Sequence, residues 1–363
     1  AEPTDATTVE LEPTTEGDGD NTATADLLPG VDLVTEEVEP GVHRVLSDGV
    51  RDLTRTEQSG FWSQRVIAGD DGSVWIVWPD GSHRIGGTAD LGGGFVDAEV
   101  GPDGRLWAPG TTTPRSHDGI AWSSDEPPSC GGPHLIEISD AGVVWASWPD
   151  TDERFGVHRL GTEGWERVAT TPRALQNRVL TLGLTHAGEV WVGGLTRDGV
   201  RGQVYFSLRS DGSWRKVTAE MMAAGNITIG DEVRWIPHGW GGTDALVRLD
   251  ASGSVSYPVA SSLPIDGDVT PRGDLFLPAS SDGSVWLRLA SEAETCDGIG
   301  RFDGTTLTRF FRDTCVYTWD VDPSGSVWLI AGHDGGAGAW HEGGVAGPFG
   351  LYVIIPEAVA GTE

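Results

Sequence analysis

A short pattern that ends in tryptophan recurs seven times in this chain of 363 residues, and it limits the possible fold more than any other feature. A typical copy is a glycine-containing turn, a small or polar residue, an aliphatic residue and then tryptophan, as in Asp71–Trp75, while the copy ending at Trp235 lacks the glycine. A repeat of about 40 to 45 residues is typical of one four-stranded blade of a β-propeller. The seven tryptophans lie 32 to 51 residues apart and are Trp75, Trp107, Trp145, Trp191, Trp235, Trp286 and Trp328.

A second pattern follows most copies, namely an arginine within an alternating segment that ends at another glycine turn. Each repeat therefore predicts a first strand, a turn, a second strand with the tryptophan, a third strand with the arginine, and a fourth strand. The 53 glycines and 21 prolines also disfavour helices, so an all-β chain is expected. The recurring arginines are Arg84, Arg159, Arg209, Arg248 and Arg301.

The two ends of the repeat region complement each other. Val42–Thr54 resembles the second half of a repeat without a tryptophan strand before it, and the last repeat, around Trp328, lacks an arginine strand. Because a ring of blades must cover its edge strands, we predict that Val42–Thr54 pairs with the last blade. The predicted fold is a seven-bladed β-propeller over residues 34–356, closed by its N-terminal segment. The short step from Trp75 to Trp107 predicts that the first blade lacks its outermost strand.

The charge of the chain excludes some partners. The formal net charge is −31, whereas a nucleic-acid-binding protein needs a cationic surface, so no nucleic-acid partner is expected. Residues 1–40 hold twelve carboxylates and no lysine or arginine, and we predict that residues 1–33 form a disordered acidic spacer. A strongly charged surface favours a soluble monomer.

The compartment is inferred from the N-terminus and the cysteines. The chain begins at Ala1 with an acidic segment rich in threonine, which is typical of the spacer of a secreted or surface-tethered bacterial protein, so an extracellular or cell-surface location is expected. No segment approaches the roughly 20 apolar residues that span a bilayer. We predict a disulfide between Cys296 and Cys315, with Cys130 left over. The alternative is three reduced thiols.

The run from Gly188 to Gly194, Gly-Glu-Val-Trp-Val-Gly-Gly, resembles the repeat of the two-component-regulator propellers, which are sensor domains outside the membrane in bacterial receptors. The same repeat is similar to that of the streptogramin B lyase propellers. The resemblance covers about Phe61 to Trp340 and implies the blade structure. Lyase activity in that family depends on a histidine and an acidic residue near magnesium, which have no match here, so we carry over no catalytic residue, metal ligand or cofactor.

The recurring residues have structural interpretations. We expect the tryptophans to pack between neighbouring blades, with ligand stacking as the alternative, and the Asp-Gly pairs to be hairpin turns although they resemble calcium loops. His43, His83 and His158 lie beside the repeated arginines and are interpreted as strand residues. Better candidates for function fall outside both patterns: His117, His134, His238, His333 and His341.

A binding site is expected on the face of the ring formed by the loops after the second and fourth strands. Exposed aromatic side chains beside polar groups suit carbohydrate or peptide recognition, although these aromatic residues could instead only cover the channel mouth. We therefore predict a non-enzymatic, secreted or surface-displayed propeller that binds a carbohydrate, peptide or protein and needs no cofactor. The alternative is an extracellular lyase or hydrolase that acts on a polysaccharide or cyclic peptide, with His238 or His333 as base beside Asp244 or Asp334. The predicted ligand-binding residues are Trp62, Arg178, His238, Trp240, Asp244, Tyr317, Trp319, His333 and Asp334.

Overall fold

The computed structural model describes 23 stretches of the chain. The regular elements in them are β-strands, apart from the single-turn 3-10 helix η2 (Arg173–Leu175) and the helical residues 221–222. This part of the chain is therefore all-β, as predicted, and it holds no helix long and apolar enough to cross a membrane. The described residues are 22–28, 31–46, 65–69, 71–78, 81–86, 90–92, 98–109, 114–118, 122–124, 135–150, 154–175, 179–185, 187–195, 203–218, 221–222, 224, 229, 232–238, 245–258, 276–290, 296–311, 314–332 and 350–355.

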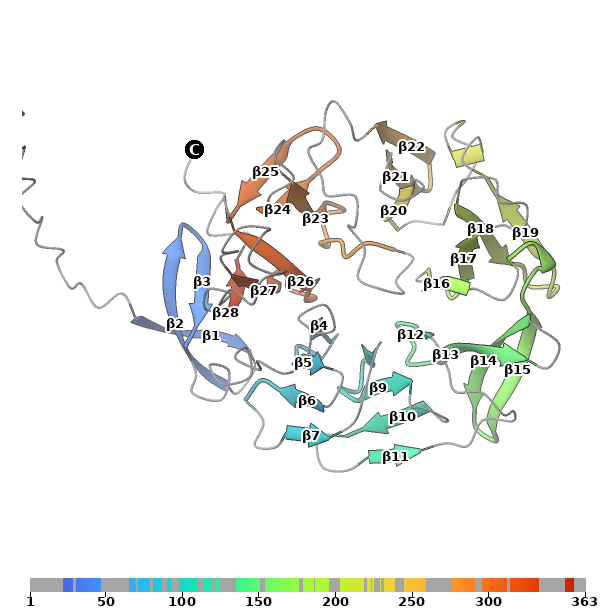
Figure 1. Ribbon diagram of the computed structural model, residues 1–363, viewed down its shortest axis with the longest axis horizontal. Coiled ribbons are helices and arrows are strands. Elements are labelled where there is room, and N and C mark those ends of the chain that lie inside the picture. Colours follow the sequence, from blue (N-terminus) through green and yellow to red (C-terminus); the bar gives the residue numbers. More distant parts are fainter. Residues whose placement is uncertain are drawn as a thin grey trace, which may run out of the picture.

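The described strands form seven separate antiparallel sheets that lie around a ring (Figure 1). In six of the sheets the described residues form a tight turn directly before the strand with the repeated tryptophan, and strands of one sheet that are consecutive in the chain pair as antiparallel neighbours. Sheet 1 contains β4 (Arg65–Ala68), β5 (Val74–Trp78), β6 (Gly81–Arg84) and β7 (Asp90–Gly92); sheet 2 contains β8 (Glu99–Val100), β9 (Leu106–Pro109), β10 (Pro114–His117) and β11 (Trp122–Ser124); sheet 3 contains β12 (Leu135–Ile138), β13 (Val144–Asp150), β14 (Arg154–Gly161) and β15 (Gly164–Thr170). Sheet 4 contains β16 (Val179–Leu184), β17 (Val190–Leu195), β18 (Gln203–Leu208) and β19 (Trp214–Val217); sheet 5 contains β20 (Arg234–His238), β21 (Ala245–Asp250) and β22 (Gly253–Pro258); sheet 6 contains β23 (Val285–Ala290), β24 (Cys296–Phe302) and β25 (Leu307–Phe310); sheet 7 contains β26 (Cys315–Val321), β27 (Val327–Gly332), β28 (Gly350–Ile354), β3 (Val42–Val45), β2 (Val31–Glu39) and β1 (Thr22–Leu28).

The repeated tryptophans form the core, as predicted. Their side chains are at most 8% exposed, and each belongs to an apolar cluster that joins its own sheet to the next one. The series continues across the chain ends, because Trp328 of sheet 7 packs in a cluster with Val66 and Ile76 of sheet 1. Tryptophan is well suited to this position because one side chain buries 150 to 250 Å². The interpretation of these residues as packing elements is therefore confirmed.

The Asp-Gly pairs form hairpin turns, as predicted. In the turn before β5, the Asp71 Oδ1 atom accepts a hydrogen bond from the Ser73 backbone N–H at 2.9 Å. Gly72 has a φ of +77°, which glycine adopts without the steric cost that a Cβ atom brings. The same bond from the backbone N–H two residues later recurs at Asp103, Asp211 and Asp282. These aspartates therefore shape the turns.

Sheet 1 differs from the expectation. It has four strands, and its outermost strand β7 pairs with β6, with Leu91 opposite Ser82. The prediction that the first blade lacks its outermost strand is wrong. Trp75 and Trp107 are only 32 residues apart because the strands between them are short: β7 has three residues and β8 has two.

The N-terminal segment joins the sheet that holds the end of the chain. Strand β3 pairs antiparallel with β28, with His43 opposite Val353, and β2 and β1 follow as further strands of sheet 7. Residues 47–54 of the predicted closing segment lie outside the described residues.

Two of the N-terminal strands overlap the predicted spacer. Residues 22–28 and 31–33 belong to β1 and β2, so the structure differs there from the expected disorder of residues 1–33. The reason is that Leu28 and Leu33 are buried in the cluster between sheets 7 and 1. This apolar burial offsets the unfavourable charge of the surrounding carboxylates. Residues 1–21 lie outside the described part of the chain, so their disorder stays a prediction.

Candidate functional site

The residues predicted to bind a ligand are only partly placed. Tyr317 and Trp319, both in β26, have described side chains, and His238 is described in its backbone as the last residue of β20. The others lie outside the described residues, so their roles stay predictions: Trp62, Arg178, Trp240, Asp244, His333 and Asp334.

Trp319 is not the exposed aromatic that was expected. Its side chain is 3% exposed and packs in the cluster between sheets 6 and 7, with Trp286 and Val316. The half-buried Tyr317 packs instead against the cluster between sheets 7 and 1. Strand β26 is the first strand of its sheet and has a neighbouring sheet on each side, so a side chain of either orientation meets packed residues. The expected exposure of Trp319 is therefore wrong.

A cavity of about 830 Å³ lies at the hub of the ring. Residues from all seven sheets or from their turns line it, including Arg65 of sheet 1, Glu137 of sheet 3 and Asp320 of sheet 7. Figure 1 shows β4, β12, β16 and β26 among the strands nearest the hub of the ring. Pockets of about 300 to 1,000 Å³ are the usual size for small-molecule sites. The hub is therefore the candidate site.

The cavity reaches one particular end of the ring. Its lining includes Asp140, Asp282 and Asp322, which belong to the turns directly before the tryptophan strands β13, β23 and β27. These turns lie at the opposite end of the tryptophan strands from the loops that follow those strands, where the binding site was expected. The hub itself was not predicted as a site, because residues of separate repeats give no local signal that they meet there.

Acidic side chains dominate the lining. Seven carboxylates and two arginines, Arg65 and Arg234, contribute to it. The carboxylates are Glu99, Glu137, Asp140, Glu232, Asp282, Asp320 and Asp322.

Several of these carboxylates hold the backbone in place. Asp320 accepts hydrogen bonds from the N–H groups of Ala68 at 2.9 Å and Val321 at 2.8 Å, and so ties sheet 7 to sheet 1. Asp322 accepts bonds from the N–H of Ser324 at 2.9 Å and from the Trp328 Nε1–H at 3.0 Å. Both side chains therefore have structural roles at the edge of the cavity.

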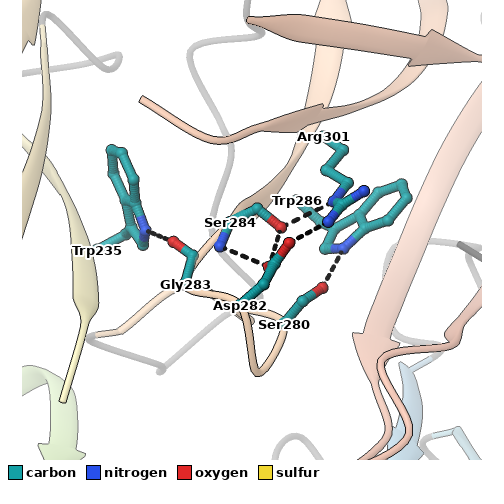
Figure 2. A network of polar contacts seen from close by, with 7 residues as sticks. All are labelled: Trp235, Ser280, Asp282, Gly283, Ser284, Trp286 and Arg301. Carbon is teal, nitrogen blue, oxygen red and sulfur yellow. Dashed lines mark hydrogen bonds and ion pairs between the residues drawn. The ribbon is translucent and has the colours of Figure 1, made fainter. Parts of the chain in front are cut away.

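Figure 2 shows the turn before β23, where such contacts form a network. The Asp282 Oδ1 atom accepts bonds from the N–H of Ser284 at 2.9 Å and from its hydroxyl at 2.6 Å, while Arg301 forms an ion pair with the same carboxylate. Burial alone raises the pKa of Asp282, but the bonds from Ser284 and Arg301 outweigh it and hold this pKa below its usual value. The Trp235 Nε1–H donates to the Gly283 carbonyl at 2.9 Å and links sheet 5 to this turn.

The repeated arginines also have a structural role, which sequence reasoning missed. In four sheets the arginine of the strand that follows the tryptophan strand lies directly opposite the repeated tryptophan. The guanidinium carbon lies 5.9 Å from the Trp75 ring for Arg84 and 5.8 Å from the Trp145 ring for Arg159, within cation–π range. The available signal was the hairpin register, which places the two patterns opposite each other. The four pairs are Trp75 with Arg84, Trp145 with Arg159, Trp235 with Arg248, and Trp286 with Arg301.

Two ion pairs lie in the cavity wall on different sheets. The Arg234 Nε atom is 2.7 Å from the Glu232 Oε2 atom, and the guanidinium carbon lies 5.4 Å from the centre of the Phe276 ring. On sheets 1 and 2, the Arg65 Nη2 atom is 3.8 Å from the Glu99 Oε1 atom. The wall therefore presents an aromatic ring and groups that donate or accept hydrogen bonds.

The described histidines lie inside the sheets. His117 is 1% exposed, packs edge-on to Trp75 with ring centres 6.1 Å apart, and has a pKa lowered by burial. His158 stacks on Trp148 at 3.6 Å. His158 is thus a strand residue, as expected, whereas His117, a better candidate for function by sequence, is a packing residue. Within the described ranges, no group of three or more histidine, cysteine or acidic residues is arranged to hold a metal ion.

Of the cysteines, Cys315 in β26 is disulfide-bonded. Cys296 is the first residue of β24, and Cys130 lies outside the described residues. The pairing of Cys296 with Cys315 stays a prediction.

The chain was compared with known proteins. No protein-family model and no curated protein matches it. Among solved structures, a chain of the mitotic checkpoint complex is 11% identical with a TM-score of 0.52, and the match covers 96% of this chain and 98% of that one. A gluconolactonase of Xanthomonas campestris is 11% identical with a TM-score of 0.40, covering 95% and 98%. YCF48 bound to D1 peptide is 14% identical with a TM-score of 0.48, covering 81% and 92%.

The seven antiparallel sheets around a ring and the likeness to a chain of the mitotic checkpoint complex agree with the propeller repeats. At such low identities the likeness concerns the fold alone, because unrelated functions share this architecture. The chain thus has a β-propeller fold.

Proposed function

We propose that this chain is an extracellular or surface-displayed binding protein that recognises a carbohydrate or peptide at the hub of its ring. The observation that carries the proposal is the cavity of about 830 Å³, which residues of all seven sheets line. The repeated tryptophans and arginines pack within and between the sheets and hold the turns. The hub cavity is the other feature to which every sheet contributes, and it has room for a ligand. The loops expected around the other end of the channel would extend the same site.

The finer architecture is part of the proposal. The seven sheets are the blades of a seven-bladed propeller, and the N-terminal strand β3 closes the last blade. The pairing of β3 with β28 and the tryptophan cluster between sheets 7 and 1 support this closure. We also propose that the repeats are of the two-component-regulator or streptogramin B lyase type, on the strength of the Gly188–Gly194 run.

The compartment and assembly follow from charge and sulfur chemistry. A disulfide-bonded Cys315 supports an oxidising compartment outside the cytosol. The net charge of −31 supports a monomer, because like charges oppose self-association.

The test is a binding screen of the purified chain against glycan and peptide arrays. If the loop face completes the site, Trp240→Ala weakens binding by about 1 to 3 kcal/mol, the scale of an interface hot spot, and leaves folding intact. Trp191→Ala, at a repeated position, is the matched control and lowers stability. The proposal is wrong if no glycan or peptide binds, and its loop component is wrong if Trp240→Ala unfolds the chain as readily as Trp191→Ala does.

A further inference from the structure

We propose that a second cavity, between the N-terminal hairpin of β1 and β2 and sheet 1, binds a small α-amino acid in its zwitterionic form. The cavity has a volume of about 260 Å³, just below the usual range of small-molecule sites, and therefore suits a small ligand. It shares no lining residue with the hub cavity, so this proposal goes beyond the function proposed above and does not depend on it.

Part of the cavity wall is a loosely held ion pair. The Arg84 Nη2 atom lies 3.4 Å from the Asp71 Oδ2 atom, and the two side chains are 40% and 23% exposed. At the same position of sheet 6, Arg301 forms an ion pair with its aspartate and also donates to the Ser284 hydroxyl at 2.8 Å. In sheet 1 the corresponding hydroxyl, that of Ser73, has no hydrogen-bond partner within the described residues. Arg84 therefore lacks the second anchor that holds Arg301.

Both charged groups have capacity for a further interaction. Within the described ranges, Arg84 has Asp71 as its one ion-pair partner and a cation–π contact with the Trp75 ring at 5.9 Å. A guanidinium has five N–H donors, and the contact with Asp71 uses one of them. The Asp71 carboxylate accepts the Ser73 backbone N–H at its Oδ1 atom, which leaves acceptor sites on Oδ2. Because an exposed ion pair contributes little to stability, a ligand that inserts beside it disturbs the fold little.

The apolar part of the wall comes from Leu28 and Val31 of the hairpin and from Ile85, which follows β6. A Cβ atom on Gly86 would lie 2.6 Å from the Val31 methyl carbons, so the hairpin approaches sheet 1 this closely only because Gly86 has no side chain. Leu28 and Ile85 are each 3% exposed, so a ligand touches only their edges. The wall therefore favours a short apolar group over a long one.

This combination of groups favours a zwitterion. An anion beside Arg84 also meets the Asp71 carboxylate, and a cation beside Asp71 also meets the guanidinium, so a single charge gains one attraction and suffers one repulsion. A neutral apolar molecule would desolvate the ion pair and offer it no hydrogen bond. An α-amino acid instead presents a carboxylate, which matches the fork of Arg84, next to an ammonium group for Asp71. Its short side chain would lie against Val31.

The test is isothermal titration calorimetry on the full chain with glycine, L-alanine and L-valine. N-acetyl-L-valine lacks the ammonium charge, and L-valine amide lacks the carboxylate. The variants are Arg84→Gln and Asp71→Asn, and Arg84→Gln, on a 40% exposed side chain, serves if Asp71→Asn does not fold. The matched control is Arg159→Gln, because Arg159 lies opposite Trp145 as Arg84 lies opposite Trp75, and it lines neither cavity.

The expected result is that L-alanine or L-valine binds, and that each blocked derivative binds at least about tenfold more weakly than L-valine. Arg84→Gln and Asp71→Asn are each expected to weaken binding about tenfold or more, the effect of losing a hydrogen bond to a charged group, while Arg159→Gln binds as the wild type does. The proposal is overturned if no amino acid binds, if a blocked derivative binds as tightly as L-valine, or if Arg84→Gln binds no more weakly than Arg159→Gln. Each of these results leaves the hub proposal standing, which the glycan and peptide arrays test separately.

Discussion

The acidic charge of residues 1–33 predicts disorder, whereas the structure packs strand β2 against sheet 1. Leu33→Ala tests this packing. Leu33 is 1% exposed and belongs to the cluster that joins sheet 7 to sheet 1, where Trp328 and Val66 also lie. Removing a buried leucine side chain typically costs about 2 to 5 kcal/mol, the sum of lost transfer free energy and the cavity that remains. Because the whole stability of a domain is about 5 to 15 kcal/mol, this loss is easily measured.

The assay is urea unfolding followed by tryptophan fluorescence. Val34→Ala is the matched control, because Val34 is the next residue of the same strand and is 45% exposed. An exposed substitution is expected to change the free energy of unfolding by about 0.5 kcal/mol or less. Equal effects of Leu33→Ala and Val34→Ala would refute the packing of β2 against sheet 1. A truncation series extends the test: removing residues 1–21 leaves the melting temperature unchanged, and removing residues 1–33 lowers it.

Three further predictions concern the contacts within and between sheets. Trp191→Ala lowers the free energy of unfolding by about 3 to 5 kcal/mol, since the buried ring joins sheets 4 and 5, and an unchanged urea midpoint would contradict that role. Tyr205→Phe costs about 1 kcal/mol in the same assay, because the buried Tyr205 hydroxyl donates to the Pro237 carbonyl at 2.8 Å, and a neutral result would remove this bond from the account. The lowered pKa of Asp282 means that its stabilisation is present above the unfolded value of 3.8 and is lost as the pH falls through the lower folded value. The stability difference between the wild type and Asp282→Asn, measured by urea unfolding from pH 6 to pH 3, therefore narrows at the acid end, and a constant difference would contradict the ion pair with Arg301.

The sequence predicted the repeating core well, because the information is local. A tryptophan three residues after the turn glycine lies on a strand, and its recurrence about every 42 residues identifies one such strand in each sheet. The same logic identified Val42–Thr54 as half of a repeat, and its described part forms β3, paired with β28.

The failures share a cause, which is that burial depends on neighbours distant in sequence. Leu28 and Leu33 stand among many carboxylates, so composition predicts disorder, yet residues of sheet 1 bury both. Trp319 and His117 lie outside the repeated patterns and were therefore interpreted as candidates for function. In the structure both are buried, Trp319 in a cluster with Trp286 and His117 against the Trp75 ring. The sequence did not predict the hub cavity, because each repeat contributes only a few of the residues that line it. Hairpin register would have identified the pairing of Trp75 with Arg84.

The central claim is that a ligand binds at the hub of the ring. The most direct measurement is an experimental structure of the full chain co-crystallised with the tightest-binding glycan or peptide of the array screen. We expect the ligand to lie in the cavity of about 830 Å³, in contact with residues of several sheets. A ligand bound on the outer strands, with the hub empty, would contradict the claim.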